Sequence, residues 1–260
     1  MRVKIIAEIG PNHNGKMKLA KKLILEAKKC GADYVKFQTF ITEDIITKKA
    51  KKANYQIDKK NEETQFKMLE KLQLTQKQFK LLFNFCKKNK IKFLSTAFDL
   101  KSLKFINSLD PEFIKIPSGE ITNFQLIKEI TKLKKKVILS TGMSNLNEIS
   151  KTYKFLIKNG IVKKKIFLLQ CNTEYPTPFS DVNLNVLKTF KKKFGDNLGY
   201  SDHTMGIEAA IASVPLGAKI IEKHFTLNRK MKGPDHKASL EPVEFKKMVD
   251  AIRNIESALG

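Results

Sequence analysis

Cysteine is scarce in this chain, and the cysteines that it has are far apart. Cys30, Cys86 and Cys171 are the only three among 260 residues, and none belongs to a Cys-x-x-Cys pair. This spacing argues against a disulfide framework or a zinc knuckle and suits a reduced cytoplasm. The chain also lacks a complete P-loop (Gly-x-x-x-x-Gly-Lys followed by Ser or Thr) and a Gly-x-Gly-x-x-Gly turn. We therefore do not expect nucleoside triphosphates or dinucleotides as ligands.

Long apolar runs are missing as well. The first apolar stretch, within residues 3–7, is too short for a signal peptide, and no later run approaches membrane-spanning length. We therefore expect a soluble, cytoplasmic protein without a membrane partner. Acidic residues are few beside the basic ones, 26 against 50, which leaves a net charge of +24. The lysines fall in runs before predicted strands rather than on one helix face, so we interpret them as solvated surface and expect no nucleic-acid partner.

Short apolar segments alternate with helical patterns along the whole chain, which is typical of a parallel sheet wrapped by helices. The predicted strands are Val3–Ala7, Tyr34–Phe37, Lys92–Leu94, Phe113–Ile116, Val137–Leu139, Ile166–Leu169, Leu198–Tyr200 and Ala218–Ile221. The predicted helices are Met17–Lys29, Gln76–Asn89, Leu100–Ser108, Asn123–Leu133, Asn147–Lys158, Asn183–Lys193, Met205–Val214 and Pro242–Leu259. Eight such repeats in 260 residues predict one domain, residues 1–260, closed into a (β/α)8 TIM barrel; an open doubly wound sheet is the alternative.

One connection is too long for this repeat. Residues 39–74, after the second predicted strand, form an extra segment. Long insertions after a barrel strand usually build a lid or a substrate wall over the active face, and we expect that role here. A solvated excursion without function is the alternative.

Two histidines lie just after the last two predicted strands. His203 follows the strand ending at Tyr200, and His224 follows the strand ending at Ile221, with a predicted helix between them. Such a β-α-β unit brings both imidazoles to the carboxyl ends of adjacent parallel strands. Because neutral imidazole is a common ligand of divalent metals, this placement predicts a catalytic metal site with open positions. A pair of hydrogen-bonded histidines is the alternative.

Two lysines lie inside apolar strands, Lys36 in Tyr-Val-Lys-Phe and Lys115 in Phe-Ile-Lys-Ile. Burying a lysine costs free energy unless the ammonium meets an anion, so the pair predicts a phosphate or carboxylate site. A Schiff-base lysine of a class I aldolase is the alternative. Other polar residues at the predicted strand ends are Glu8, Gln38, Thr39, Ser95, Thr96, Ser118, Glu120, Ser140, Thr141, Gln170, Asn172, Thr173 and Ser201.

A series of ordered motifs resembles the sialic acid synthase family, from Glu8 to about Glu241. The motifs are Glu8-Ile9-Gly10-Pro11-Asn12-His13-Asn14-Gly15, Val35-Lys36-Phe37-Gln38-Thr39, Lys115-Ile116-Pro117-Ser118-Gly119-Glu120, Ser140-Thr141-Gly142-Met143, Tyr175-Pro176-Thr177-Pro178, Gly199-Tyr200-Ser201-Asp202-His203-Thr204, Glu222-Lys223-His224-Phe225-Thr226 and Gly233-Pro234-Asp235-His236. So many motifs in order are far more specific than any single one.

The resemblance implies a TIM barrel that condenses phosphoenolpyruvate with an N-acetylated mannose-type sugar, giving a nine-carbon α-keto acid and phosphate. It implies a divalent metal, Mn²⁺ or Mg²⁺, held by His203 and His224, and a homodimer. The groups expected to hold phosphoenolpyruvate are Lys36, Lys115, Ser118, Ser140, Asn172 and Ser201. Glu8 is expected to be the catalytic carboxylate. Gln38, Glu120, Tyr175 and Asp235 are expected around the sugar and the attacking water, Glu120 with a catalytic role.

Two features depart from the family pattern. Cys171-Asn172-Thr173-Glu174 stands where family members commonly read Cys-Thr-Asn, which leaves Asn172 and Thr173 as alternatives for one contact. Glu174 resembles the legionaminic acid branch. The chain stops at Gly260, where family members continue into an antifreeze-like domain that lends an arginine to the partner's site in a domain-swapped dimer. We therefore expect either a fragment or an activity that is weakened or completed by another chain, and a ligand-binding barrel with little turnover is one alternative. A pseudaminic acid synthase, which differs only in the stereochemistry of the sugar, is another.

Overall fold

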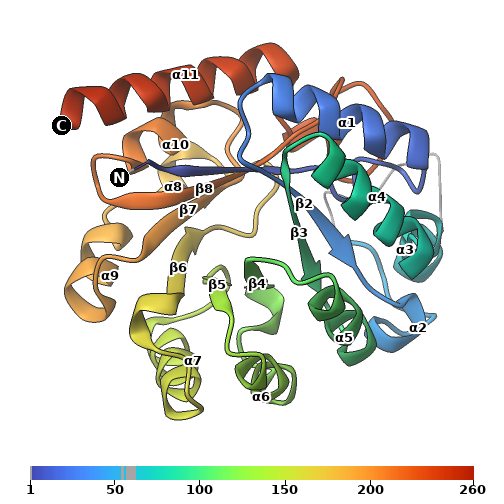
Figure 1. The fold of residues 1–260 in the computed structure, drawn as a ribbon, viewed down its shortest axis with the longest axis horizontal. Helices are drawn as coiled ribbons and strands as arrows, with labels where there is room; N and C mark the ends of the chain where they lie inside the picture. Colours follow the sequence, from blue (N-terminus) through green and yellow to red (C-terminus); the bar gives the residue numbers. More distant parts are fainter. Residues whose placement is uncertain (1, 54–55, 57–62) are drawn as a thin grey trace.

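The computed structural model describes residues 2–53, 56 and 63–260, which form a closed barrel of eight parallel strands in sequence order (Figure 1). The strands are β1 (Lys4–Glu8), β2 (Tyr34–Thr39), β3 (Lys92–Ala97), β4 (Phe113–Ile116), β5 (Lys136–Ser140), β6 (Ile166–Cys171), β7 (Leu198–Asp202) and β8 (Ala218–His224). The barrel closes where β1 pairs with both β2 and β8, which places Glu8 opposite Lys36 on one side and His224 on the other. The predicted (β/α)8 barrel is confirmed.

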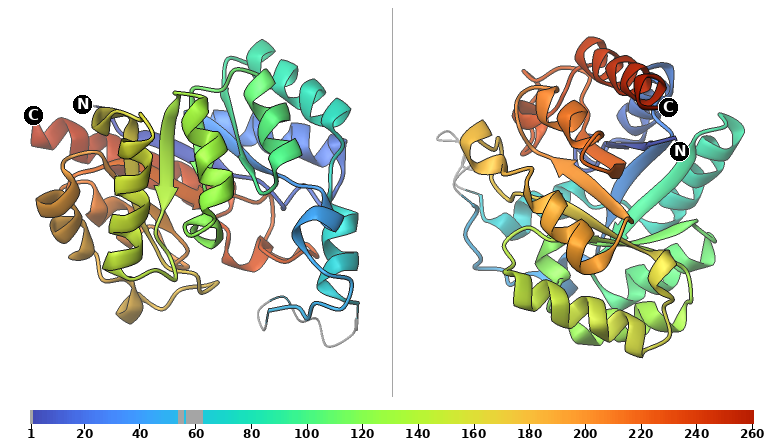
Figure 2. Two further views of the ribbon diagram at one scale, coloured as in Figure 1. Left: turned by 90° about the horizontal axis from the view of Figure 1, so that it is seen from below. Right: turned by 90° about the vertical axis from the view of Figure 1, so that its left-hand side faces the viewer.

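Helices surround the barrel on its outer side (Figures 1 and 2). They are α1 (Met17–Lys29), α2 (Thr42–Ile45), α3 (Gln65–Leu72), α4 (Gln76–Lys88), α5 (Leu100–Ser108), α6 (Phe124–Lys132), α7 (Leu146–Lys158), α8 (Phe179–Val182), α9 (Val186–Phe194), α10 (Glu208–Ser213) and α11 (Pro242–Leu259), with short 3₁₀ turns at Ser118–Glu120, Lys163–Lys165 and His236–Ala238. The local sequence determines where several of these helices begin. Thr75 and Gln78 form a capping box before α4, and Pro242 begins α11.

Most strands run one to three residues further than predicted at their carboxyl ends. β3 continues to Ala97 rather than Leu94, and β8 continues to His224 rather than Ile221. The prediction ended each strand where apolar residues gave way to polar ones. In the closed barrel those polar residues still pair with neighbouring strands, so the extra residues belong to the sheet.

The barrel interior is apolar in one half only. A cluster of alternate strand residues fills the amino-terminal half, namely Ile6, Tyr34, Leu94, Phe113, Ile138, Phe167, Leu169 and Ile220. The larger core lies between the outer strand faces and the helices. Because side chains alternate along a strand, the next inward-facing residues toward the carboxyl ends form a separate layer above this cluster. That layer is polar.

The insertion after β2 packs beside the carboxyl ends of the strands. Phe40 forms a small apolar cluster with Met68 and Leu72 of α3. Thr42, at the start of α2, donates its backbone N–H and its hydroxyl to Gln73 Oε1 at 2.8 and 2.7 Å. The described part of the insertion is thus attached beside the carboxyl ends of the strands, and its role as a lid or substrate wall stays a prediction. Residues 54–55 and 57–62 of it lie outside the described part.

The lysine runs at 134–136, 163–165 and 191–193 precede β5, β6 and β7, and so lie toward the amino ends of these strands. Among the described residues, none of the helices combines the length and the apolar character needed to cross a membrane.

Candidate active site

Four charged side chains occupy the polar layer of the barrel interior. Glu8 ends β1, Lys36 lies in β2, Lys115 in β4 and Glu222 in β8. Their exposed fractions are 1%, 4%, 3% and 4%. Both sequence-predicted lysines are therefore buried, as expected, and the anions that they meet belong to the chain itself.

Glu222 lies between the two lysines. Its carboxylate oxygens are 3.1 and 3.0 Å from Lys115 Nζ, and Oε1 is 3.4 Å from Lys36 Nζ. Lys36 also forms a short ion pair with Glu8 and donates to Thr96 Oγ1 at 3.3 Å. Because charges are strongly coupled in a water-poor interior, two cations and two carboxylates here form one ionic cluster.

The two carboxylates differ in proton affinity. Burial raises the pKa of Glu8 to about 7, although Lys36 opposes the shift. Burial acts on Glu222 in the same sense, but Lys115 and Lys36 outweigh it and lower the pKa of Glu222 to about 2. Burial lowers the pKa of Lys115, whereas Glu222 and Glu8 outweigh burial and raise the pKa of Lys36. Glu222 is thus the permanent counter-anion, and Glu8 can exchange a proton near neutral pH.

Sequence reasoning assigned no role to Glu222. The signal was present, because Glu222 precedes His224 by two residues on one strand and must share its face. Thr96 and Cys171 join the interior by the same alternation. The high pKa of Lys36 also bears on the aldolase alternative, since a Schiff-base lysine must be a neutral amine to attack a carbonyl.

The two predicted imidazoles meet at the mouth of the barrel. The ring centroids of His203 and His224 are 5.3 Å apart with an interplanar angle of 62°. His203 Nδ1 is 2.5 Å from the Asn172 carbonyl oxygen, which can only accept, so this nitrogen carries a proton; in the neutral ring Nε2 then keeps a lone pair. His224 Nδ1 forms no hydrogen bond in the described part of the chain and lies 3.5 Å from Asp235 Oδ2.

The protonation of these groups follows from their surroundings. Burial lowers the pKa of His224 well below its usual value, with a further contribution from the neighbouring His203. Burial also disfavours charge on His203, but Cys171 and the Asn172 carbonyl outweigh it and raise the pKa. Burial raises the pKa of Asp235 to about 6. The mouth therefore combines a neutral imidazole, His224, with a carboxyl group, Asp235, whose pKa is about 6.

The two histidines fit a divalent cation. A metal-ligating histidine commonly donates its other N–H to a carbonyl, as His203 does, and a buried imidazole nitrogen without a hydrogen bond is a free ligand. Over the described ranges, no three His, Cys, Asp or Glu side chains form a complete ligand set. Such a pair would leave positions for water and substrate, as in a catalytic rather than a structural site.

Tyr175 lies against both imidazoles. Its ring centroid is 4.1 Å from that of His203 and 5.7 Å from that of His224. Asp235, from the segment after β8, faces the same His224. The structure therefore brings two of the predicted sugar-side residues to the predicted metal ligands.

Hydroxyl groups lie around the ionic cluster. Ser201 donates to Glu222 Oε1 at 3.3 Å. Ser118 Oγ accepts from the Gly142 backbone N–H at 3.0 Å and is 3.7 Å from Cys171 Sγ. Ser140 Oγ is buried and forms no hydrogen bond with any described residue, which leaves it available to a ligand.

Three predicted residues lie further from the cluster or turn away from it. Gln38 donates its amide to the Gly10 carbonyl at 3.1 Å, and Glu120 Oε2 accepts from Asn123 at 2.6 Å. The Asn172 side-chain amide donates to the Asp181 carbonyl at 2.7 Å, so Asn172 supports His203 through its backbone. Contacts of these side chains with a substrate stay predictions.

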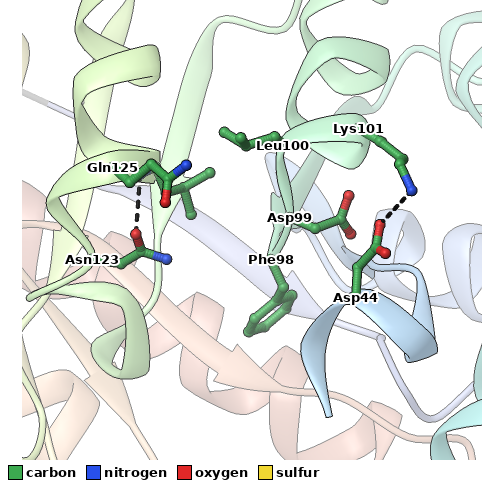
Figure 3. Close-up of a pocket in the computed structure, with 8 residues that line it drawn as sticks. Asp44, Phe98, Asp99, Leu100, Lys101, Asn123 and Gln125 are labelled. Carbon is green, nitrogen blue, oxygen red and sulfur yellow. Dashed lines mark hydrogen bonds and ion pairs between the residues drawn. The ribbon is translucent and has the colours of Figure 1, made fainter. Parts of the chain in front are cut away.

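A separate depression of about 360 Å³ lies between the amino ends of α5 and α6 (Figure 3). Asp44 and Lys101 form an ion pair at one side of it, with atoms 2.9 Å apart, and Phe98 is among the residues that line it. None of the predicted site residues lines it, and Asn123 links it to Glu120. It is a neighbour of the mouth rather than the centre of the chemistry.

Barrel enzymes carry out their chemistry at the carboxyl ends of the strands, where this chain gathers its buried charges and imidazoles. The fold and the site define an enzyme of the (β/α)8-barrel class. The NeuB family matches residues 23–260, and the chain belongs to that family.

The relatives agree with this assignment. The N,N'-diacetyllegionaminic acid synthase of Campylobacter jejuni is 53% identical over 257 residues, covering 98% of this chain and 77% of that protein. The N-acetylneuraminate-9-phosphate synthase of Drosophila melanogaster is 37% identical over 255 residues, covering 98% and 68%. The crystal structure of an N-acetylneuraminic acid synthetase from Leptospira borgpetersenii, in complex with citrate, superposes with a TM-score of 0.89 at 33% identity, covering 100% and 86%.

Proposed function

We propose that this enzyme condenses phosphoenolpyruvate with an N-acetylated mannose-type sugar, releasing phosphate and a nine-carbon α-keto acid. The observation that carries the proposal is the pair of buried lysines, Lys36 and Lys115, in the same mouth as His203 and His224. An anionic substrate and a sugar aldehyde can meet there. Membership of the NeuB family and the names of its synthases support the same reaction.

Phosphoenolpyruvate carries a phosphate and a carboxylate, and the ionic cluster supplies a cation for each. Lys115 and Lys36 now share Glu222, so an incoming anion would take over part of the coordination of both ammonium groups. Ser201 and the free hydroxyl of Ser140 add donors. Charge-assisted hydrogen bonds of this kind are strong and hold the substrate in one orientation.

His203 and His224 would hold a divalent cation, Mn²⁺ or Mg²⁺, which when bound supplies a Lewis acid for the sugar aldehyde. Tyr175 packs on both rings and limits their rotation. Gln38, Glu120 and Asp235 remain the candidates for contacts with the sugar.

Glu8 is the candidate acid and base. In the condensation, the methylene carbon of phosphoenolpyruvate forms a bond with the aldehyde carbon, and the aldehyde oxygen gains a proton. The central carbon becomes cationic and takes up water, one proton of which passes to a carboxylate. The carbon–oxygen bond to phosphate then breaks as the new hydroxyl becomes the keto oxygen, and the hydroxyl proton leaves with the phosphate. With a pKa of about 7, Glu8 can accept and return this proton at neutral pH, and its charge stabilises the cationic carbon.

We propose a diacetamido-trideoxy sugar of the legionaminic type as the acceptor. The 53% identity to the Campylobacter jejuni legionaminic enzyme supports this choice over a pseudaminic sugar, since a pseudaminic acid synthase of the same species is 35% identical.

Phosphate release tests the proposal. The purified chain is mixed with phosphoenolpyruvate and Mn²⁺ and with each of three sugars: N-acetylmannosamine, the legionaminic-type sugar and its pseudaminic-type stereoisomer. We expect release only when a sugar is present, and fastest with the legionaminic-type sugar. Lys115→Met should abolish release, whereas Lys219→Met, on the partly exposed outer face of β8, should not.

Thermal stabilisation by phosphoenolpyruvate without release from any sugar would instead identify a ligand-binding barrel and contradict the proposed turnover.

A further inference from the structure

Two buried charged residues play no part in the proposed chemistry, yet each lies between two residues of the site. Asp202 stands between Ser201 and His203, and Lys223 stands between Glu222 and His224. Because side chains alternate along a strand, Asp202 and Lys223 point to the outer face of the barrel while their neighbours point into the mouth. The two residues are direct partners in the register of β7 and β8.

Lys223 and Asp202 form a complete hydrogen-bond network. Lys223 Nζ is 2.7 Å from Asp202 Oδ2, 2.7 Å from the Thr204 carbonyl oxygen and 3.3 Å from Thr204 Oγ1. Asp202 Oδ1 accepts from the Thr204 backbone N–H at 2.9 Å and from the Tyr200 hydroxyl at 3.2 Å. The ammonium thus uses all three donors, and both carboxylate oxygens are occupied.

Stability of the fold is a weak reason for this pair. Both side chains have an exposed fraction of 0%, and removing two charges from water costs about as much as their attraction returns. In many proteins, apolar residues of similar volume replace such a buried pair without loss of stability.

The position of the Lys223–Asp202 pair, beside both histidines in the sequence, offers a better reason for its presence. The network holds the backbone on both sides of His203, at Asp202 and Thr204, to the residue directly before His224. The distance between the two imidazoles therefore depends on this network as well as on the pairing of β7 with β8. A ligand pair for one ion requires such a connection, because residues behind metal ligands set their orientation and tune metal affinity.

We propose that Lys223, through Asp202 and the Thr204 carbonyl, is a positioning residue that holds His203 and His224 at the separation needed to bind one divalent cation. This inference rests on the proposed function. The network does not touch the substrate or the ion. It fixes the two strand ends that carry the ligands.

The test measures Mn²⁺ affinity directly, from the electron paramagnetic resonance signal of free Mn²⁺ over the purified chain. The main variant is Asp202→Asn with Lys223→Met, which removes both charges together and leaves neither buried alone. We expect its midpoint of thermal unfolding in EDTA to stay within a few degrees of the parent, and its Mn²⁺ dissociation constant to rise at least tenfold.

Two control variants are measured in the same way. Lys219→Met removes a lysine from the same strand and the same outer face, where it forms no ion pair with the described residues, and should leave Mn²⁺ affinity unchanged. His203→Ala removes a ligand and sets the affinity expected of a broken site.

An unchanged Mn²⁺ dissociation constant in the folded double variant overturns the inference and leaves the ion pair with a purely structural role. If the double variant does not fold, Asp202→Leu with Lys223→Leu, an apolar pair that also leaves no charge buried alone, gives the same comparison. A parent chain that binds no Mn²⁺ also overturns it. Intact Mn²⁺ binding without phosphate release overturns the proposed function alone.

Discussion

Glu222 sets the charge of the mouth before any substrate arrives. It contacts both buried lysines, and its pKa of about 2 keeps it ionised at neutral pH. An anionic substrate must therefore compete with the Glu222 carboxylate for the two lysine ammonium groups. The affinity of the site for anions is thus limited by a residue of the chain itself.

Glu222→Gln should make the site bind anions more tightly. The substitution removes one negative charge beside two cations, so the dissociation constant for inorganic phosphate should fall about tenfold, which is about 1.4 kcal/mol. Isothermal titration calorimetry measures this constant. The free energy of unfolding should fall at the same time, because the lysines lose their shared counter-anion.

The matched control is Glu112→Gln. Glu112 pairs with Lys92 and Lys136 beside the first residues of β3, β4 and β5, so the same change of net charge occurs far from the mouth. Phosphate affinity should not change in this variant. Weaker or equal phosphate binding by Glu222→Gln would contradict the role given to Glu222.

At the scale of elements, the loop after β1 contacts both the insertion and the segment after β8 near Gly15. This residue follows β1 with a φ of +69°, and a Cβ added to it would lie 2.2 Å from the Lys71 carbonyl oxygen of α3. Its backbone N–H donates to His13 Nδ1 at 3.0 Å, and Asn14 donates to the Lys232 carbonyl at 2.8 Å. The loop after β1 is thereby held to the insertion and to the segment after β8.

Gly15→Ala should displace the insertion. A side chain there adds backbone strain and a clash with α3, so we expect a loss of about 2 kcal/mol or more in the free energy of unfolding and a several-fold rise in the KM for the sugar. Chemical denaturation and steady-state kinetics measure the two effects.

Gly217→Ala is the control that separates the effect of backbone strain from the effect of the clash with α3. Gly217 has a φ of +100° and open space around its Cβ position, so it adds strain alone. We expect some loss of stability and an unchanged KM. A sugar KM that rises equally in both variants would show that the contact with α3 does not shape the site.

At the scale of the whole molecule, several histidines are kept neutral by burial. Burial lowers the pKa of His13 and of His236 from 6.5 to about 4. A group with a lowered pKa in the folded state stabilises the fold above its unfolded pKa and loses that contribution as the pH falls. Glu8 acts in the opposite sense, because its raised pKa makes the folded state bind a proton that the unfolded state releases between pH 4.5 and about 7.

Stability should therefore fall as the pH drops from 6.5 toward 4. His13 alone accounts for about 3 kcal/mol over this window. His13, His224 and His236 together outweigh the opposite contributions of Glu8, Asp235 and His203. Thermal unfolding at a series of pH values measures the effect. His13→Gln should flatten the curve and Glu8→Gln should steepen it; the reverse order would contradict the assigned proton affinities.

The sequence predicted the barrel because its eight strands and its helices differ in periodicity, which is a local property. It placed the strand ends too early, since β3 and β8 continue through polar residues. Only closure of the barrel gives those residues a buried interior in which to lie, and no local pattern records that closure.

By itself, the sequence determined which side chains stand at the strand ends. Lys36, Lys115, His203 and His224 were found there because each is a polar residue within or just after a short apolar segment that predicts a strand. The tertiary structure alone decided their partners. Lys115 meets Glu222 from 107 positions away, and that contact, through burial and distance, sets which carboxylate stays charged and which can carry a proton.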